Sequence, residues 1–421
     1  MPGILFLTQR IPYPPTKGEK IRAFQILKYL SLSHDIYLGC LIDDPQDLKH
    51  VSAVNALCAH SFFATLDRRR ARISCLRGLL TGEPLSVCFY RNRGLARWVA
   101  QVLRELAPEV IFVSSSNMAP YVLGLQSRIP VFVVDMVDVD SEKWRAYSKR
   151  GPLLLRLVHE REWRRVSKLE ARIGHACDWV TFVSPEEAAL FARQHPEVSP
   201  KIRAISNGVD HIFFDPAHRF EAPYETDHHN FVFTGTMDYP PNIDAATWFA
   251  RTILPLIHRN DPDARFHIVG ANPAAGVRQL TATKGVFVTG AVRDVRPYVA
   301  FAAACVAPLR IARGIQNKVL EAMAMARTVV VTPEALEGIA ALPEREVLLA
   351  ETPEAFAAAC LYAASAGSLA IGQAARRRII SDYNWAERLR GFDPLLRRPR
   401  GGAEELTPSG DQVPYEADTT G

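Results

Sequence analysis

The sequence predicts an α/β protein made of two doubly wound domains in series, each with a parallel sheet covered by helices. Three observations support this prediction. The chain has 421 residues, which is too long for one ordinary core and suits two domains. Short apolar, strand-like segments alternate with segments of helical periodicity. This alternation is interrupted by the turn-rich stretch 207–230 and then starts again.

The first half opens with an apolar strand at 3–8, followed by a segment of helical periodicity at 21–33. Helical segments separate most of the strands that come next. Because strand, helix and strand follow in turn, we expect a parallel sheet with helices on both faces. The further strands are expected at 35–42, 109–115, 130–138, 178–184 and 201–206.

The second half repeats this pattern. Strands are expected at 231–237, 264–271, 285–292, 305–310 and 328–333, with helices at 242–259, 295–304 and between the last two strands. The last periodic segment is 376–396, and the polar, Gly- and Pro-rich remainder is typical of a disordered tail. We therefore divide the chain into a first domain (1–208), a second domain (209–378), a C-terminal helix that could pack back on the first domain (379–396) and a tail (397–421).

Several classes of protein do not fit the composition. The seven cysteines are scattered and none forms a C-x-x-C pair, so we expect neither a disulfide framework nor a zinc site, and we expect a cytoplasmic protein. The N-terminus lacks the pattern of a signal peptide. No apolar run approaches the roughly 20 residues that a membrane-spanning helix needs.

Positive charge is concentrated in the first half. Residues 1–210 carry 29 Lys and Arg against 21 Asp and Glu, whereas the remainder carries 21 against 24. A basic half could face nucleic acid, an anionic membrane or a phosphorylated substrate, and we do not expect nucleic acid here. The stretches 66–80 and 150–173 mix arginine with leucine. They are either solvated helix faces or a peripheral membrane surface.

A candidate anion site follows the strand that ends at Arg310. Gly314 precedes a helix that carries Lys318 and Glu321. A helix start attracts anions, and Arg310 with Lys318 would suit a diphosphate. Glu321 lies on the same helix face as Lys318 and could accept hydrogen bonds from a ribose diol. The alternative is an ordinary surface Lys–Glu pair.

Other strand ends also suit a nucleotide. Strands end at glycine in "FTGTM" (233–237) and "VTGAV" (288–292), and glycine lets a backbone approach a ligand closely. Neither a G-x-G-x-x-G fingerprint nor a P-loop is present, which disfavours a dinucleotide dehydrogenase or a P-loop ATPase. In the first domain, the loop with Lys17 and Gly18 either binds a phosphorylated ligand or is a simple turn.

Three carboxylates lie in the second half of the strand expected at 130–138 or just after it. They are Asp135, Asp138 and Asp140. Clustered carboxylates can bind a metal or hydrogen-bond sugar hydroxyls, and they can equally cap the next helix, with Asp140 or Ser141 as N-cap.

These motifs together resemble the retaining, nucleotide-sugar-dependent glycosyltransferases of family 4, which have the two-Rossmann GT-B fold. The resemblance covers about residues 3–396. It is carried most specifically by "NGVD" after a strand and by the "KVLEAMA" helix, with "VTFVSPEE" and "FVFTGTMDYPPNIDA" in support. The stretches "RIPYPPTKGEK" and "VDMVDVDSEKW" resemble the subgroup associated with bacterial exopolysaccharide and exosortase (PEP-CTERM) systems.

The resemblance implies a role for each matching position. Glu321 would hold the donor ribose, Gly235 would begin the donor-phosphate loop and Val292 would lie in the base-contacting loop. Gly18, with Lys17 beside it, would lie near the acceptor and the donor phosphate. The usual first-domain histidine is absent, and we favour Asp138 over Asp135 for the catalytic position.

Two departures concern the donor. Arg313 stands where the family usually has a glutamate that contacts the donor sugar, and the loop after Gly235 lacks the usual basic pair. Arg310 and Lys318 could replace that charge.

The resemblance implies transfer of a hexosyl group, with retention and without a metal or other cofactor. The donor would be a nucleoside diphosphate sugar, and the acceptor a glycan or lipid-linked hydroxyl. The alternatives are a nucleotide-sugar epimerase of the same fold and a non-catalytic nucleotide-sugar binder.

Overall fold

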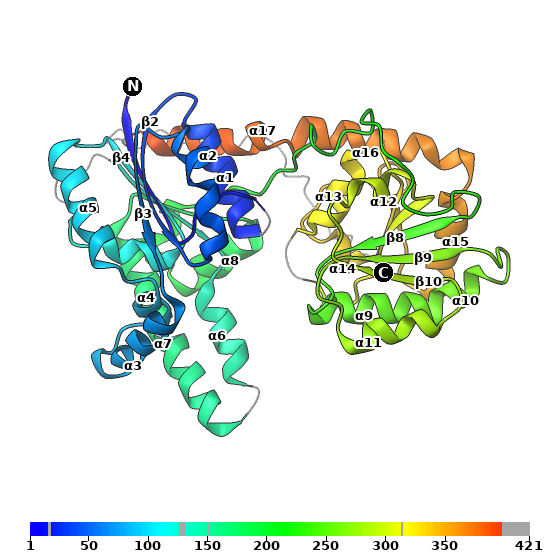
Figure 1. Ribbon diagram of the computed structural model, residues 1–421, viewed down its shortest axis with the longest axis horizontal. Helices are drawn as coiled ribbons and strands as arrows, with labels where there is room; N and C mark the ends of the chain where they lie inside the picture. The colour runs from blue at the N-terminus through cyan, green and yellow to red at the C-terminus, as the bar shows by residue number, and fades with distance from the viewer. Residues whose placement is uncertain (16–17, 126–130, 150–151, 313–314, 398–421) are drawn as a thin grey trace, which may run out of the picture.

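The computed structural model describes residues 1–15, 18–125, 131–149, 152–312 and 315–397. It has two α/β domains, each built around a parallel sheet, placed next to each other along the longest axis (Figure 1). The predicted α/β class and two-domain plan are confirmed. Among the described residues, no helix is long and apolar enough to cross a bilayer.

The first sheet has seven parallel strands in the order β3-β2-β1-β4-β5-β6-β7. Successive side chains of β1 alternate between its two faces, so both faces are buried and the strands are apolar runs. The strands are β1 (Gly3–Thr8), β2 (Asp35–Ile42), β3 (His60–Thr65), β4 (Val110–Ser114), β5 (Val131–Val137), β6 (Trp179–Phe182) and β7 (Ile202–Ala204). β3 was not expected, because this edge strand is only partly buried and its apolar run is short.

Helices cover both faces of this sheet. They are α1 (Gly18–Leu30), α2 (Val51–Asn55), α3 (Arg68–Thr81), α4 (Leu85–Phe89), α5 (Arg93–Glu105), α6 (Asp140–Ser148), α7 (Leu153–Ala176) and α8 (Pro185–Gln194), with 3-10 turns η1 (Pro45–His50), η2 (Ser116–Tyr121) and η4 (Pro196–Lys201). α6 and α7 pair as a hairpin that projects beyond the body of the domain (Figure 1).

The second sheet has six parallel strands in the order β10-β9-β8-β11-β12-β13. The strands are β8 (Asn230–Thr234), β9 (Arg265–Val269), β10 (Val286–Gly290), β11 (Ala304–Ala307), β12 (Val329–Val331) and β13 (Leu348–Leu349). Its helical elements are α9 (Pro240–Trp248), a π-turn η5 (Phe249–Ile253), α10 (Leu254–Ile257), α11 (Ala275–Gln279), η6 (Leu280–Ala282), α12 (Arg296–Ala300), α13 (Asn317–Ala324), α14 (Pro333–Leu336), α15 (Pro353–Ala363), η7 (Ala366–Ser368) and α16 (Leu369–Asp382). The two-residue β13 was not expected because it is too short to show a pattern.

The chain then returns to the first domain. α17 (Trp385–Leu389) and η8 (Arg390–Leu396) follow α16, and their residues Trp385, Leu389, Phe392 and Leu395 join the core under β1 and β4. The single helix expected at 376–396 is divided, because the side chain of Asn384 accepts from the Glu387 amide and starts a new helix. The boundary expected at 378 falls inside α16.

The "NGVD" loop and the returning segment cross at close range. The Val209 amide donates to the Tyr383 carbonyl at 2.7 Å. A Cβ atom on Gly208 would lie 2.7 Å from the Trp385 backbone, so only glycine fits this crossing. The two chain segments that join the domains are therefore held together at one point.

Candidate functional site

A cavity of about 570 Å³ opens in the first domain where its central strands end. Ligands of open α/β sheets bind outside the carboxyl ends of the strands, and this cavity has that position. Its floor is formed by the ends of β1, β4, β5 and β6, and Ile315 of the second domain completes the wall. The polar lining residues are Thr8, Gln9, Arg10, Glu19, Lys20, Ser86, Tyr90, Ser114, Ser115, Asn117, Asp138, Asp140, Lys143 and Asn207.

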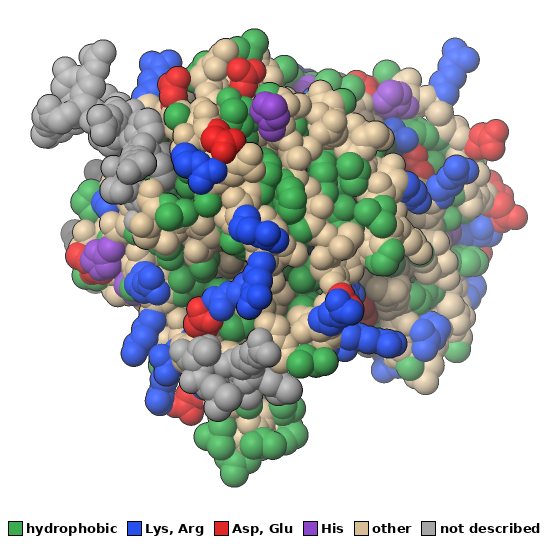
Figure 2. All heavy atoms as spheres, turned by 60° about the vertical axis from the view of Figure 1, so that its left-hand side comes forward, with side chains coloured by type: hydrophobic (Ala, Val, Ile, Leu, Met, Phe, Trp, Pro, Cys, Tyr) green, Lys and Arg blue, Asp and Glu red, His purple; other side chains and the backbone are tan. Residues whose placement is uncertain are grey.

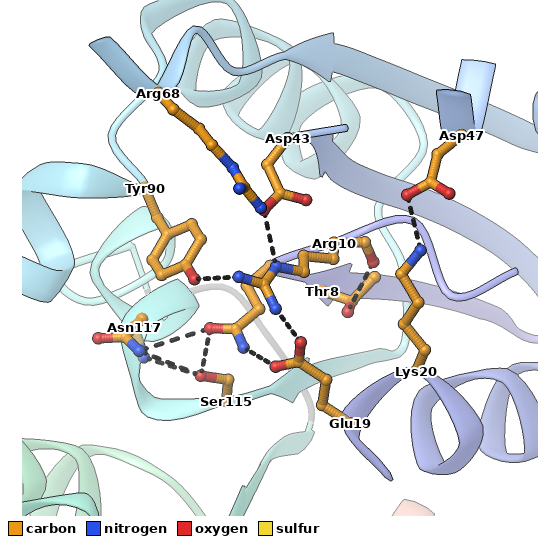
Figure 3. Close-up of polar contacts among 11 residues, drawn as sticks. Thr8, Arg10, Glu19, Lys20, Asp43, Asp47, Arg68, Tyr90, Ser115 and Asn117 are labelled. Carbon is orange, nitrogen blue, oxygen red and sulfur yellow. Dashed lines mark hydrogen bonds and ion pairs between the residues drawn. The ribbon is translucent and has the colours of Figure 1, made fainter. Parts of the chain in front are cut away.

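Charged side chains on the rim of this cavity are joined in one network (Figure 3). Arg10 forms ion pairs with Glu19 and with Asp43, the latter at 3.0 Å. Glu19 also accepts a 2.7 Å hydrogen bond from Gln9, whose amide oxygen accepts from the Ser115 hydroxyl at 3.1 Å. The network links the loop after β1, the start of α1 and the loop after β4, so it fixes the shape of the cavity mouth.

Asp138 enters the cavity from a strained loop after β5. The register between β5 and β6 shifts between Asp135 and Val137, and Val137 has φ 71°, which a β-branched residue rarely adopts. Two glutamates hold the loop: the half-buried Glu187 accepts from the Val139 amide at 2.7 Å, and the buried Glu170 accepts from the Ser141 amide at 3.0 Å. The expected N-cap role of Asp140 or Ser141 is wrong, because α6 begins at Asp140 and these glutamates satisfy its first amides.

Asp135 and Asp138 have different surroundings. Asp135 is fully buried. Its carboxylate accepts two 2.7 Å hydrogen bonds from Arg22 and a third hydrogen bond from the Thr181 hydroxyl. Asp138 lines the cavity, and no described residue donates a hydrogen bond to its side chain. Partial desolvation raises the pKa of Asp138, while Lys143 and Arg22 act in the opposite direction. Of the two, Asp138 is the one that a substrate can reach.

A second cavity of about 350 Å³ lies between the domains. Glu321 and Asn317 of α13 line it from the second domain, and Gly18 and Asn207 belong to its lining and to that of the first cavity. Asn207 accepts a 2.9 Å hydrogen bond from Arg22, the partner of Asp135. The two cavities therefore meet at Gly18 and Asn207, and the Gly18 predicted for the acceptor and phosphate loop lies at their junction.

Lys318 is tied to the Gly235 loop through Asn242. The Lys318 ammonium donates to Asn242 Oδ1 at 2.7 Å, and Asn242 Nδ2 donates to the Thr236 carbonyl. Gly235 has φ 155°, and a Cβ there would lie 2.7 Å from Asn242. The predicted Lys318 and Gly235 are thus brought together, and Asn242 is a connecting residue that the sequence did not single out.

The ionisable pair of α13 is desolvated. Burial raises the pKa of Glu321 to about 7 against the opposite effect of Lys318. Burial lowers the pKa of Lys318 to about 8, against the opposite effect of Glu321. No ion pair within 4.0 Å joins them, and among the described residues none donates a hydrogen bond to the Glu321 carboxylate. The Glu321 carboxylate and the Lys318 ammonium can therefore interact with a ligand. Their desolvation lowers the stability of the folded protein.

The other residues predicted to bind the donor differ in their surroundings. Arg310 is exposed and forms a two-pronged ion pair with Asp244, at 3.0 Å and 2.5 Å, over the Trp248 ring. Arg310 can therefore reach a diphosphate only by leaving Asp244. Val292 follows β10 and packs on the edge of the second core. Lys17, Arg313 and Gly314 lie outside the described residues.

The described residues contain a cluster of potential metal ligands outside the lining of both cavities. Within the described ranges, the one group of three potential ligands is Glu225, Asp227 and His228, near the surface before β8. The residues of both cavities supply carboxylates, amides, hydroxyls and cations, a set that can bind sugar hydroxyls and a diphosphate.

Comparison with known proteins identifies similar glycosyltransferases. Residues 228–365 match the family model described as "Glycosyl transferases group 1". The matched residues lie within the second domain. No curated protein matches the sequence.

Solved structures match nearly the whole chain. A glycosyltransferase from Rickettsia africae ESF-5 has a TM-score of 0.61 at 14% identity, over 94% of this chain and 97% of that one. Sucrose-phosphate synthase from Thermosynechococcus elongatus has a TM-score of 0.64 at 17% identity, over 94% and 98%. Anabaena Alr3699/HepE, solved in complex with UDP-glucose, has a TM-score of 0.61 at 12% identity, over 94% and 99%. The fold is GT-B, as the sequence predicted.

Proposed function

We propose that this protein is a retaining, metal-independent glycosyltransferase of family 4. It moves a hexosyl group from a nucleoside diphosphate sugar to a hydroxyl of a glycan or lipid-linked acceptor. The observation that carries the proposal is the meeting of two cavities at Gly18 and Asn207. One has the α13 carboxylate Glu321, and the other is large, polar and lined mainly by the first domain. A donor and an acceptor would then meet at the junction.

Each donor group has a role in this proposal. Lys318 and the backbone of the Gly235 loop hold the diphosphate, where a desolvated cation stabilises the charge that develops as the leaving group departs. Glu321 accepts hydrogen bonds from the ribose hydroxyls. Val292 lies near the base. Because Lys318 supplies the positive charge, the proposed reaction needs neither a metal ion nor another cofactor.

Asp138 is the proposed catalytic residue on the acceptor side. Its strained loop places in the large cavity a carboxylate to which no described residue donates a hydrogen bond, where it can contact sugar hydroxyls at the reacting carbon. Closure of the cleft would exclude water and favour transfer over hydrolysis.

The large acceptor cavity favours a transferase over an acceptor-free epimerase. We place the enzyme at the cytoplasmic face of a bacterial membrane, in exopolysaccharide or cell-surface glycan synthesis of the exosortase-associated (PEP-CTERM) type. The seven free cysteines suit a reducing compartment, and the basic first domain suits an anionic membrane surface.

The test is a calorimetric screen of UDP-glucose, UDP-N-acetylglucosamine and GDP-mannose, one of which we expect to bind. Glu321→Ala should abolish that binding. Glu351→Ala, an exposed glutamate of the same domain, is the matched control and should bind like the wild type. If no donor binds, or if both variants bind equally well, the donor site is misplaced.

Turnover then separates the remaining functions. A donor labelled in the sugar is incubated with and without a bacterial lipid and glycan extract. Label that enters the extract supports a transferase. Conversion of the donor to its epimer without extract would show an epimerase, and binding without either reaction would show a non-catalytic binder.

A further inference from the structure

The outer face of α7 changes character along the helix. At about 100° per residue, Leu153, Leu154 and Leu157 lie on the same side as the basic residues further along, and opposite the buried Val166 and Ile173. The basic residues on that side are Arg161, Arg164, Arg165, Lys168 and Arg172. One continuous solvent face is therefore apolar at its start and cationic over the rest of its length.

The apolar part is the tip of the projecting hairpin. Leu153, Leu154, Leu155 and Leu157 have exposed fractions of 71%, 75%, 50% and 56%. The hairpin extends away from the sheet (Figure 1), and Figure 2 shows that its end is covered by hydrophobic side chains, with Lys and Arg side chains above them. Scattered exposed leucines are ordinary, but four at the end of a projection mark an interaction site.

Three of the cations have no acidic partner in the part of the chain that the structure describes. Arg161 and Arg164 pair with the neighbouring glutamates Glu162 and Glu160. In contrast, no carboxylate of the described residues lies within 4.0 Å of the charged groups of Arg165, Lys168 or Arg172.

These three unpaired cations line one wall of a cavity. It has a volume of about 370 Å³, and its other lining residues include Pro84, Leu169 and the ion pair of Glu83 with Arg91. An anionic headgroup could enter this space.

We propose that this face of α7 docks on an anionic phospholipid surface. The leucine tip enters the outer part of the acyl region. α7 is inclined to the surface, so that Arg165, Lys168 and Arg172, further along the same face, bind the headgroup phosphates. The order of the side chains matches a membrane interface, in which hydrocarbon lies below a layer of phosphate. A second copy of the chain fits less well, because a two-fold contact through this face would bring like charges together.

Docking through the hairpin also orients the large cavity. Asp140, Lys143 and Trp144 of α6 line that cavity, and the tip lies at the other end of α6. Nine helical residues span about 13 Å, so the cavity would lie at most about one α6 length above the interface, within reach of a lipid-linked acceptor. This orientation rests on the proposed function, whereas docking itself does not depend on the donor site.

The test is flotation of the full chain with phosphatidylcholine vesicles, with or without phosphatidylglycerol, at low and high salt. We expect flotation on the anionic vesicles at low salt and its loss at high salt. A tip variant (L153Q, L154Q, L157Q) and a charge variant (R165E, K168E, R172E) should each reduce partitioning by more than about tenfold. Both changes are on exposed side chains, and circular dichroism checks that the variants fold.

Matched controls carry the same changes elsewhere. L32Q, L48Q and L369Q replace three other exposed leucines, and R251E, R259E and R345E reverse three exposed charges of the second domain. These controls should float like the wild type. Docking is refuted if the wild type stays unbound, or if the tip and charge variants float as well as the controls do.

Two further measurements distinguish the rival explanations. A dimer in solution that the tip variant dissociates would show that the partner is a second copy, against the proposal. UDP binding should be unchanged in the tip and charge variants, because the donor residues lie in the other domain. If the wild type floats but binds no nucleotide, the proposed function fails and the docking surface stands.

Discussion

Two pairs of opposite charge, one in each domain, have opposite environments. In the first domain, Arg22 and Asp135 are 1% and 0% exposed and share two 2.7 Å hydrogen bonds. In the second domain, Lys318 and Glu321 share a helix face without an ion pair, and burial moves the pKa of each toward the neutral form. The charges of Arg22 and Asp135 are compensated by each other, whereas those of Lys318 and Glu321 are not.

The difference distinguishes a structural pair from a ligand-binding one. A buried charge is tolerated when hydrogen bonds and an opposite charge compensate for lost hydration. Arg22 and Asp135 meet that condition within the protein and, through Asn207, support the junction of the two cavities. Lys318 has a hydrogen bond to the neutral Asn242 but no ion pair with a described residue, and no described residue donates to Glu321. A diphosphate and a ribose diol would therefore provide the missing partners.

The largest expected effect is on stability, from breaking the pair in the first domain. Arg22→Met leaves Asp135 buried without its cation and should lower the free energy of unfolding by about 3–5 kcal/mol, measured by urea denaturation at pH 7. Lys318→Met is the matched change in the other pair. It removes a cation that burial already disfavours and should cost less than about 1 kcal/mol. Equal losses in the two variants would contradict the distinction.

The next effect is on donor affinity. Lys318→Met should weaken UDP binding by about 10- to 100-fold, because hydrogen bonds to a charged group contribute roughly 1.5–3 kcal/mol. In the wild type, affinity should fall as the pH rises through about 8, since Lys318 then loses its proton. Lys318→Arg keeps its charge throughout and should show no such fall. The Lys318 pKa of about 8 lies between pH 7 and about 9.5. If the wild-type affinity for UDP is constant over this interval, Lys318 does not bind the phosphates.

A smaller effect is on the pH dependence of stability. The pKa of Glu321 is raised in the folded protein, so its protonated form favours folding, and that contribution is lost as the pH rises toward about 7. Glu321→Gln cannot ionise. It should match the wild type near pH 5 and be more stable by on the order of 1 kcal/mol at pH 8, measured by thermal unfolding. The exposed Glu351→Gln should show no such difference, and a wild type that gains stability between pH 5 and 8 relative to Glu321→Gln would refute the desolvation of Glu321.

The sequence predicted the strands well, but it did not predict the contacts between side chains that are far apart in the chain. Most expected strands are present because a strand buried on both faces is a continuous apolar run, whereas the half-exposed β3 and the two-residue β13 carry no such pattern. Glu321, Lys318 and Gly235 could be singled out as candidates because glycine and charged residues at the ends of strands are visible in the sequence itself. The ion pair of Arg310 with Asp244 and the link through Asn242 were not, because these partners are more than 60 residues away in the chain.

The smallest expected effect on stability is at Asp138, three residues from Asp135. Asp138→Asn removes no hydrogen bond to a described residue and should change the free energy of unfolding by less than about 0.5 kcal/mol. It should nevertheless lower transfer from the donor by at least about 100-fold, if this carboxylate contacts the reacting sugar. Asp135→Asn is the matched control and should instead destabilise the fold, because it leaves Arg22 buried without its counter-charge. Urea denaturation and the labelled-donor assay measure both quantities, and loss of stability in Asp138→Asn, or full activity in it, would assign the catalytic position to another residue.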